Sequence, residues 1–329
     1  MSYPLVSIIV PIYNVGRYIE KCVHSLMSQT YENIEFIFVD DASQDDSVNK
    51  MFSVISQYQN RKHQVKIIEH QENKGLPAAR NSGLANSLGE YIFHCDSDDW
   101  VDSSMITDMV NYAVKFDADI VYADFYLTYS KNDRYMKQPS SNSSLECIKM
   151  MLQGSMKYNV WNKLIRKSVY TNNGIVFPAG RGMGEDMTIV KLFVHAKNVQ
   201  YIPQAYYHYI QMNTNAHTKT YSKKHLEDVK YNAYNLLDYL QKEGFSNVYE
   251  SEFNFFKLNL KLPFLISEKY KMYSLWRKWF PESNKYIIKN PSVSIRIKLL
   301  QLLAILKLDC LIWLYNVVFM RFIYGIIYR

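Results

Sequence analysis

The stretch YIFHCDSDDW, residues 91–100, places three aspartates directly after an apolar run: Asp96, Asp98 and Asp99. Carboxylates crowded in this way repel one another and lose hydration wherever they are partly buried. A hard divalent cation takes oxygen ligands, so it would neutralise that repulsion while also holding phosphate oxygens. One residue separates Asp96 from Asp98, and in extended backbone their side chains therefore share a side. The pattern indicates a metal–phosphate site.

A second interpretation of the same residues is the start of a helix. Ser97, Asp98, Asp99 and Asp102 are all residue types that favour a helix N-terminus, through capping hydrogen bonds and the helix dipole. Acidic clusters before helices are common, and this stretch by itself leaves both interpretations open.

A second acidic group, VDDASQDDS, occupies residues 39–47. One of Asp40 and Asp41 must point along the strand end, where a carboxylate could accept hydrogen bonds from a ribose or a base. Ser43 or Asp45 is expected to cap the helix that follows. The sequence contains neither GxGxxG nor GxxxxGK[ST], so dinucleotide and P-loop sites lack their main support.

The elements that must position these residues alternate between strand and helix over the first 130 residues. This alternation predicts an α/β fold with a mostly parallel sheet and helices on both faces. Ligands of such sheets bind beyond the C-terminal strand ends, where Asn14, Asp40 and Asp96 to Asp99 fall. The strands are expected at residues 6–14, 34–43, 65–70, 90–96 and 118–129, and the helices at 17–29, 45–58, 76–87 and 103–116.

The later part of the chain has a different pattern. Residues 131–144 form an expected polar loop, and residues 184–197 an expected helix with acidic residues at its start. Two strand-like runs follow at 199–203 and 205–210, and the pattern is helical from about residue 222. We therefore expect a domain boundary near residue 218, after an α/β domain over 1–218. A helical region over 219–329 would follow.

The segment from about 285 to 329 is apolar and basic. It carries seven cations and one anion, seven minus one or +6, within a chain whose net charge is +7. Lys307, Asp309 and Arg321 interrupt it, so an interfacial helix at an anionic membrane surface is favoured over a full span, with a core helix as the alternative. The cations are not clustered, which argues against nucleic acid as partner. Four scattered cysteines suit a reducing compartment, hence the cytoplasmic face of a membrane.

Three segments together carry a resemblance: residues 6–43, 73–84 and 89–100. In order and spacing they resemble glycosyltransferase family 2, inverting enzymes with the GT-A fold, of the bacterial surface-polysaccharide type. The similarity continues more weakly through VWNKLIRKSVY and GEDMTIVKLF to about residue 215. The resemblance implies a nucleotide-sugar donor, such as a UDP-sugar, and a glycan or lipid-linked glycan acceptor. It also implies that residues 1–218 are the catalytic domain, with a nucleotide-sugar half (1–130) and an acceptor half (131–218). It also leaves open an inactive subunit that acts as a scaffold in glycan assembly.

The resemblance implies roles for individual positions. Asp40 would read the base, Asp96 and Asp98 would hold the diphosphate with Mg²⁺ or Mn²⁺, and Asp99 would face the donor sugar. The implied nucleotide and donor set is Pro11, Tyr13, Asn14, Asp40, Lys74, Gly75, Arg80, Asp96, Ser97, Asp98 and Asp99.

The remote pair Glu185 and Asp186 matches the family's late acidic pair, whose aspartate is the usual general base. An inverting transfer needs a carboxylate to take the proton of the attacking hydroxyl. The alternative is simple complementarity to a helix dipole. Trp161 and Lys163 match an element on the acceptor side, although Trp161 could equally be a core aromatic.

One departure from the family lies after the late helix. Arginines that contact the diphosphate are common there, whereas this chain has Tyr209 and Gln211. His208, His217 or Lys219 could substitute, but a histidine in an aromatic strand is more often structural.

Overall fold

The computed structural model describes residues 3–182, 184–213, 222–245 and 249–318. By packing, the chain forms two compact units. The first contains Met1–Ile148 and Tyr158–Tyr239, and the second contains Lys149–Lys157 and Leu240–Arg329. This division falls after Tyr239, later than the expected boundary near residue 218.

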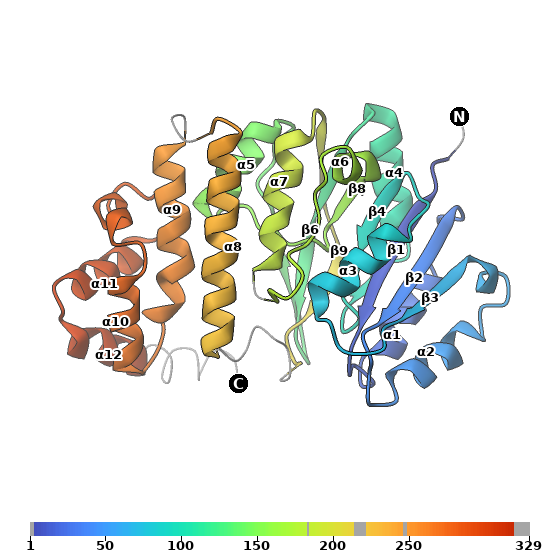
Figure 1. The fold of residues 1–329 in the computed structure, drawn as a ribbon, viewed down its shortest axis with the longest axis horizontal. Helices are drawn as coiled ribbons and strands as arrows, with labels where there is room; N and C mark the ends of the chain where they lie inside the picture. Colours follow the sequence, from blue (N-terminus) through green and yellow to red (C-terminus); the bar gives the residue numbers. More distant parts are fainter. Residues whose placement is uncertain (1–2, 183, 214–221, 246–248, 319–329) are drawn as a thin grey trace. The chain divides into compact units, whose positions relative to one another are not determined.

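The first half of the sheet is parallel, as the alternating pattern predicts. Its strands follow the order β3-β2-β1-β4, and helices connect them (Figure 1). Every residue of β1 is buried, which explains its unbroken apolar run. The strands are β1 (Val6–Ile12), β2 (Ile34–Asp40), β3 (Val65–Glu69) and β4 (Tyr91–His94), and the helices are α1 (Ile19–Met27), α2 (Ser47–Ile55) and α3 (Leu76–Ala85).

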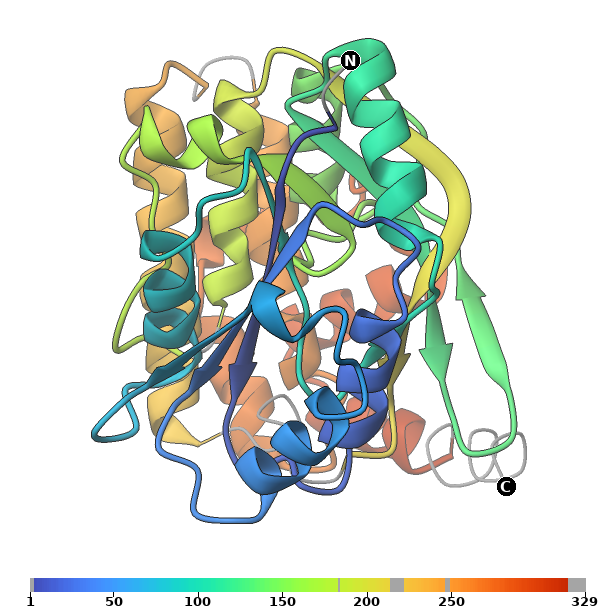
Figure 2. The same cartoon turned by 90° about the vertical axis from the view of Figure 1, so that its right-hand side faces the viewer.

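The second half of the sheet is mixed, so the sheet is parallel only in part. β8 lies between β4 and β6 and is antiparallel to both, while β9 runs parallel to β6. Figure 2 shows β9 (yellow) curving alongside the β6–β7 hairpin (green). The strands are β5 (Trp100–Val101), β6 (Ile120–Thr128), β7 (Asp133–Met136), β8 (Lys163–Arg166) and β9 (Val199–Ile210).

Two details correct the sequence expectations. The two strand-like runs after residue 198 form one strand, β9, opposite an irregularity in register at Asp124 of β6. The expected loop 131–144 contains β7, which pairs with the outer end of β6. Most of β7 is exposed, so it lacks the alternating apolar pattern by which a strand is recognised.

Further helices lie wholly or mainly in the first unit, except that the division between units cuts α5 after Ile148 and α8 after Tyr239. Residues 184–197 begin with a 3-10 turn, η2, before the helix α7, and α7 lies beside α8 (Figure 1). The helices are α4 (Met105–Phe116), α5 (Ser144–Gln153), α6 (Lys167–Thr171), η2 (Glu185–Met187), α7 (Thr188–His195) and α8 (Lys223–Lys242).

The second unit is helical, as expected. Its core contains Lys261, whose ammonium group donates to the carbonyls of Trp279 and Phe280 and lies 4.2 Å from the Trp276 ring. The elements are α9 (Glu250–Lys261), η4 (Leu262–Phe264), α10 (Tyr270–Lys278), η5 (Pro281–Tyr286), α11 (Ile295–Ile305) and α12 (Asp309–Asn316). Across the described ranges, none of the helices is both long enough and apolar enough to cross a membrane.

Candidate active site

The loops after β1 and β2 lie against each other. The Asn14 side chain accepts a hydrogen bond from the Gln44 amide at 2.8 Å, and the Asn14 amide donates to Ser43 Oγ at 3.3 Å. Asn14 has φ +52°, a conformation that asparagine tolerates better than most residues. Tyr13 beside it is exposed, whereas Pro11 is buried in β1. Two hydrogen bonds therefore hold the loop after β1, which carries part of the implied donor set, against the loop after β2.

The structure separates the roles of Asp40 and Asp41. Asp41 is buried, and its carboxylate accepts hydrogen bonds from the amides of Lys74 and Gly75 at 2.9 and 2.7 Å, with His70 Nδ1 at 2.6 Å. Asp41 thereby fixes the turn before α3, where Gly75 has φ +86° and a side chain would be strained. Asp40 is half-buried and its carboxylate accepts from the Ser43 amide at 3.1 Å. Asp40, rather than the buried Asp41, is thus the partly exposed carboxylate at the C-terminal end of β2.

Arg80 connects the two acidic groups of the sequence. From α3 its guanidinium donates to Asp96 Oδ1 at 2.9 Å and to Asp186 Oδ1 at 3.0 Å, and it lies 3.5 Å from Glu185 Oε1. Arg80 is only 1% exposed, so this is a buried cation surrounded by three carboxylates. The acid at the end of β4 and the acid pair ninety residues later therefore belong to one cluster, which we call the Arg80 cluster (Arg80, Asp96, Glu185 and Asp186).

The electrostatics of this cluster suit proton transfer. Burial raises the pKa of Asp186 above its usual value, and Arg80 opposes part of that rise. Burial and the neighbouring Asp186 raise the pKa of Glu185 to about 8. Burial lowers the pKa of Lys163 to about 7, against the attraction of Asp186, and its ammonium group donates to Asn159 O and Asn162 Oδ1. An aspartate whose pKa is raised is more basic than usual, which suits a general base.

The aspartates after β4 do not begin a helix. β5 follows Asp96, Asp98 and Asp99 directly and α4 starts only at Met105, so the helix-start interpretation is wrong for these three residues. Asp102 lies just before α4, and its carbonyl accepts a hydrogen bond from the Met105 amide at 3.1 Å. Asp99 is buried, and its two oxygens accept hydrogen bonds from the Tyr207 hydroxyl at 2.8 Å and the Ile210 amide at 2.7 Å. Asp99 thus anchors β9, and its expected role toward a donor sugar stays a prediction. Ser97 is buried as well.

Asp96 and Asp98 form a donor set that fits a divalent cation. Asp98 accepts a hydrogen bond from Asn213 Nδ2 at 2.8 Å, and burial together with the nearby Asp96 raises its pKa. Within the described ranges no group of three acidic, histidine or cysteine side chains gathers as a closed metal site. Two carboxylates suit Mg²⁺ or Mn²⁺, because such ions keep several positions for water and substrate phosphates.

Tyr207 is a site residue that sequence reasoning missed. Its hydroxyl accepts from the Asp96 amide at 3.1 Å and donates to Asp99, so it sets the backbone between the two acids. The Trp161 ring stacks on Tyr207 with centroids 4.3 Å apart and is itself buried, which makes Trp161 a core aromatic. Tyr207 and Tyr209 share one face of β9, and this alternation was the available signal.

Of the proposed substitutes for diphosphate-binding arginines, His208 is the one that the structure describes. His208 lies stacked between Trp100, at 3.4 Å between centroids, and Tyr126, at 4.7 Å. Burial lowers its pKa, so it is a neutral structural ring. Tyr209 contacts Trp161, with ring centroids 5.2 Å apart. His217 and Lys219 lie outside the described residues.

This architecture defines a class of protein. A parallel half-sheet ends in polar loops, and Arg80 joins a remote acid pair to Asp96 at one of these strand ends. The parallel half followed by a mixed half is the fold of a GT-A glycosyltransferase. The chain also matches the sequence model of glycosyl transferase family 2 over residues 7–188. It therefore belongs to glycosyltransferase family 2.

Individual relatives of this chain also carry the name glycosyltransferase. EpsH of Bacillus subtilis (strain 168) is 31% identical over 240 residues, 69% of this chain and 66% of EpsH, and its name places it among the glycosyltransferases. EpsJ of the same strain is 30% identical over 273 residues, 80% of this chain and 78% of EpsJ. The crystal structure of S. aureus TarS in complex with UDP-GlcNAc is 17% identical with a TM-score of 0.61, covering 94% of this chain and 89% of that one. At that identity the likeness to TarS concerns the fold alone.

Proposed function

We propose that the protein transfers a sugar from a UDP-sugar to a hydroxyl of a growing surface glycan, with inversion at the anomeric carbon. The observation that carries this proposal is the Arg80 cluster. A single buried arginine holds Asp96, the implied diphosphate residue, and Asp186, the implied base, at 2.9 and 3.0 Å. A donor on Asp96 and an acceptor hydroxyl at Asp186 would thus meet across one guanidinium group.

Asp186 would act as the general base. In an inverting transfer the acceptor oxygen bonds to the anomeric carbon as the bond to the diphosphate oxygen breaks, and a carboxylate takes the acceptor proton. The anomeric carbon gains positive charge in the transition state, which nearby carboxylates stabilise. Glu185, with a pKa of about 8, is largely protonated at neutral pH and is the weaker candidate.

The donor would lie along the ends of β1, β2 and β4. Asp40 would accept hydrogen bonds from the base or ribose, with Tyr13 after β1 and Lys74 after β3 following the two neighbouring strands. Asp96 and Asp98 would hold a divalent cation, which supplies positive charge to the diphosphate leaving group when it is bound. This chain has Tyr209 and Gln211 where the family's arginines are common, and Arg80 is a cation that contacts Asp96, at 2.9 Å.

A donor screen tests the proposal. With Mn²⁺ present, we expect one member of a panel of UDP-, GDP- and dTDP-sugars to release nucleotide diphosphate, and UDP to bind in calorimetry. Asp98→Asn should weaken metal-dependent UDP binding by roughly tenfold or more, because a carboxylate ligand is lost. Glu72→Gln, at an exposed position before α3, is the control and should leave binding unchanged. Absence of both hydrolysis and nucleotide binding would rule out the enzyme, and binding without turnover would favour a scaffold.

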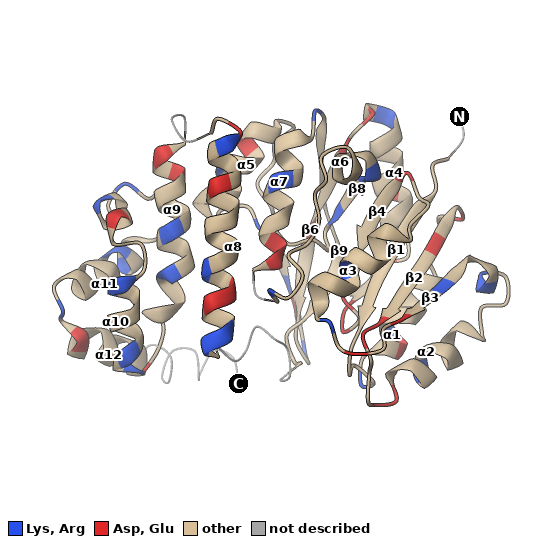
Figure 3. Cartoon of the chain, viewed as in Figure 1, with Lys and Arg blue, Asp and Glu red and all other residues tan. Residues whose placement is uncertain are grey.

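The acceptor is proposed to be lipid-linked, because α11 and α12 present an exposed apolar face. Four residues in α11, at its C-cap or in α12 are more than half exposed although they are large and apolar, and they define this α11–α12 face: Ile295, Leu299, Leu306 and Leu314. Patches of this kind mark interaction surfaces. The five cations of residues 285–318 (blue in Figure 3) accompany them, whereas the one anion there, Asp309, is paired with Arg277 at 2.7 Å. Apolar and cationic groups together fit an anionic lipid surface.

The triple variant Leu299→Ser, Leu306→Ser, Leu314→Ser is expected to lose membrane binding. Each leucine contributes roughly 1.5–3 kcal/mol on full burial. Because the three leucines insert only in part, we expect the affinity for the membrane to fall by about 100-fold or more. Co-sedimentation with vesicles of 30% phosphatidylglycerol in phosphatidylcholine measures it, and added salt should weaken wild-type binding. Leu88→Ser, 77% exposed in the first unit, is the control. Equal sedimentation of the triple variant and wild type would contradict a membrane role for this face.

A further inference from the structure

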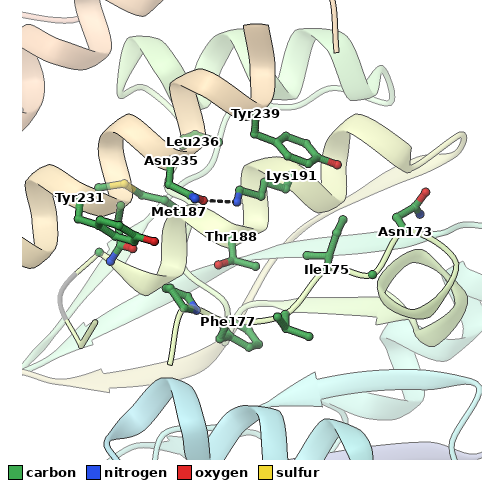
Figure 4. A pocket seen from close by; sticks show the side chains of 15 residues that line it. Asn173, Ile175, Phe177, Met187, Thr188, Lys191, Tyr231, Asn235, Leu236 and Tyr239 are labelled. Carbon is green, nitrogen blue, oxygen red and sulfur yellow. Dashed lines mark hydrogen bonds between the residues drawn. The ribbon is translucent and has the colours of Figure 1, made fainter. Parts of the chain in front are cut away.

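A separate pocket lies behind the Arg80 cluster. Residues 173–178, α7 and α8 enclose about 260 Å³, and all of its lining residues belong to the first compact unit (Figure 4). This volume lies below the roughly 300–1,000 Å³ of pockets for drug-sized ligands, which suits one sugar ring better than a whole oligosaccharide. We call it the α8 pocket.

The walls of the α8 pocket combine an apolar floor with a polar rim. Ile175, Phe177 and Leu236 are buried at the floor. Tyr231 and Tyr239 project from α8 into the rim, and both rings are labelled in Figure 4. Aromatic rings that are apolar in the body and polar at the tip suit the faces of a sugar, which are themselves part apolar and part hydroxyl-bearing.

The rim also presents hydrogen-bonding groups that match hydroxyls. Lys191 Nζ donates to Asn235 Oδ1 at 2.5 Å and lies 5.0 Å from the Tyr239 ring, and Asn173 stands at the other end of the pocket (Figure 4). Amides both donate and accept, as hydroxyls do. None of the residues described as lining the pocket is Asp or Glu, so a cation–diphosphate ligand does not fit there.

The α8 pocket shares structure with the proposed base. Phe177 lines the pocket and also lies 5.5 Å from the Arg80 guanidinium. Gly184, Met187 and Thr188 line it while Glu185 and Asp186, between them in sequence, bond to Arg80 on the other side of η2. An occupant of the pocket would therefore contact the same turn that carries the base.

Arg181 fixes the segment before η2 to α8. Its guanidinium lies 3.2 Å from the buried Asp228 carboxylate and 4.5 Å from the Tyr231 ring. Tyr231 thus belongs both to the pocket rim and to the anchor of the chain that leads to Asp186. These contacts of Arg181 accordingly fix the position of the α8 wall of the pocket.

We propose that the α8 pocket binds a sugar residue of the acceptor glycan, other than the residue that receives the transferred sugar. This inference rests on the proposed function, since it assigns the acceptor side of the same reaction. The donor groups lie at the ends of β1, β2 and β4, whereas this pocket lies across η2 from them. Its occupant would hold the acceptor chain beside the turn that carries Asp186.

Saturation-transfer NMR on the full chain tests the proposal, with the methyl glycosides of glucose, galactose, N-acetylglucosamine and rhamnose as probes. At least one is expected to bind, and Tyr231→Ala should weaken it by about two- to tenfold, because a sugar-facing ring is lost. Asn235→Ala, which removes a rim amide at an exposed position, should weaken the same probe.

The matched control is Tyr234→Ala. Tyr234 lies on the same helix, is 51% exposed against 47% for Tyr231, and likewise has a cation near its ring, but it is not part of the pocket lining. It should leave sugar binding unchanged, and UDP affinity should stay within about twofold in all three variants. Binding of none of the probes, or equal binding by Tyr231→Ala and wild type, would overturn the pocket assignment. If the wild-type protein did not bind UDP, the proposed function itself would be refuted.

Discussion

Asp186→Asn is expected to lower kcat for sugar transfer by about 10²–10⁴-fold, the range that a positioned general base contributes. Asparagine keeps the shape of the side chain and still offers an oxygen to Arg80, which lies 3.0 Å away. It cannot accept the proton of the attacking hydroxyl. UDP affinity should remain within about threefold of wild type, because Asp186 does not belong to the donor-binding set. Initial rates and calorimetry on the same preparations measure both quantities.

Glu185→Gln is the matched comparison for this prediction. The two acids are adjacent, both contact Arg80, and burial raises both pKa values. If Asp186 is the base, Glu185→Gln should retain far more activity than Asp186→Asn. The reverse order would assign the base to Glu185.

The pH profile gives an independent readout of the base. A base must be deprotonated, so kcat rises with pH through its pKa in the complex. Because burial raises the pKa of Asp186, the acid limb should lie above the usual value of 3.8 for aspartate. An acid limb near pH 8 would point instead to Glu185, whose pKa is about 8.

Arg80→Met is expected to destabilise the first unit by about 3–5 kcal/mol, as when one partner of a buried ion pair is removed. Three carboxylates would keep their places around an apolar side chain and lose the charge that offsets their burial. For a unit of this size the loss corresponds to a fall in Tm of roughly 6–20 °C. Thermal unfolding followed by circular dichroism measures it, and transfer activity should disappear as well.

Arg166→Met is a matched control, because Arg166 also contacts three carboxylates, those of Glu90, Asp117 and Asp119. Its side chain is 21% exposed against 1% for Arg80. Water and salt screen such pairs, so a cost of about 1 kcal/mol is expected. Equal losses of Tm in the two variants would contradict the view that the Arg80 cluster is held by buried charge.

The effect of Arg80→Met should also depend on pH. The folded-state pKa values of Glu185 and Asp186 lie above their ordinary values, so the stability linked to these carboxylates is complete in acid and is lost as pH rises through the folded pKa. Removing Arg80 takes away a group that lowers both pKa values. The destabilisation should therefore be smaller at pH 5 than at pH 8.

Much of this protein could be predicted from local pattern. The strands and helices of the first 100 residues follow from hydrophobic periodicity, and their alternation places Asn14, Asp40 and Asp96 at neighbouring strand ends. The family motifs also identified Glu185 and Asp186 as a second acidic group. Each of these inferences uses residues that are close in sequence, or a topology in which successive strands are parallel and adjacent.

Other features depended on contacts between distant segments. Asp40 and Asp41 are adjacent and chemically identical, and only the turn at Lys74 and Gly75 makes Asp41 the structural one. Asp99 follows the Asp96–Asp98 motif directly, but Tyr207 and the Ile210 amide, more than 100 residues later, donate to its oxygens. No periodicity encodes which carboxylate a distant tyrosine will reach.

By itself, the sequence determined the class of fold, the carboxylates at the strand ends and the basic, apolar character of the last segment, because these follow from local composition and spacing. Only the tertiary structure decided that β8 lies between β4 and β6, and that Arg80 bonds to both Asp96 and Asp186. The tertiary structure also brings together the segments before and after η2 that enclose the α8 pocket. The physical reason is that long-range pairing and burial select partners by shape and charge in three dimensions, which a linear pattern does not contain.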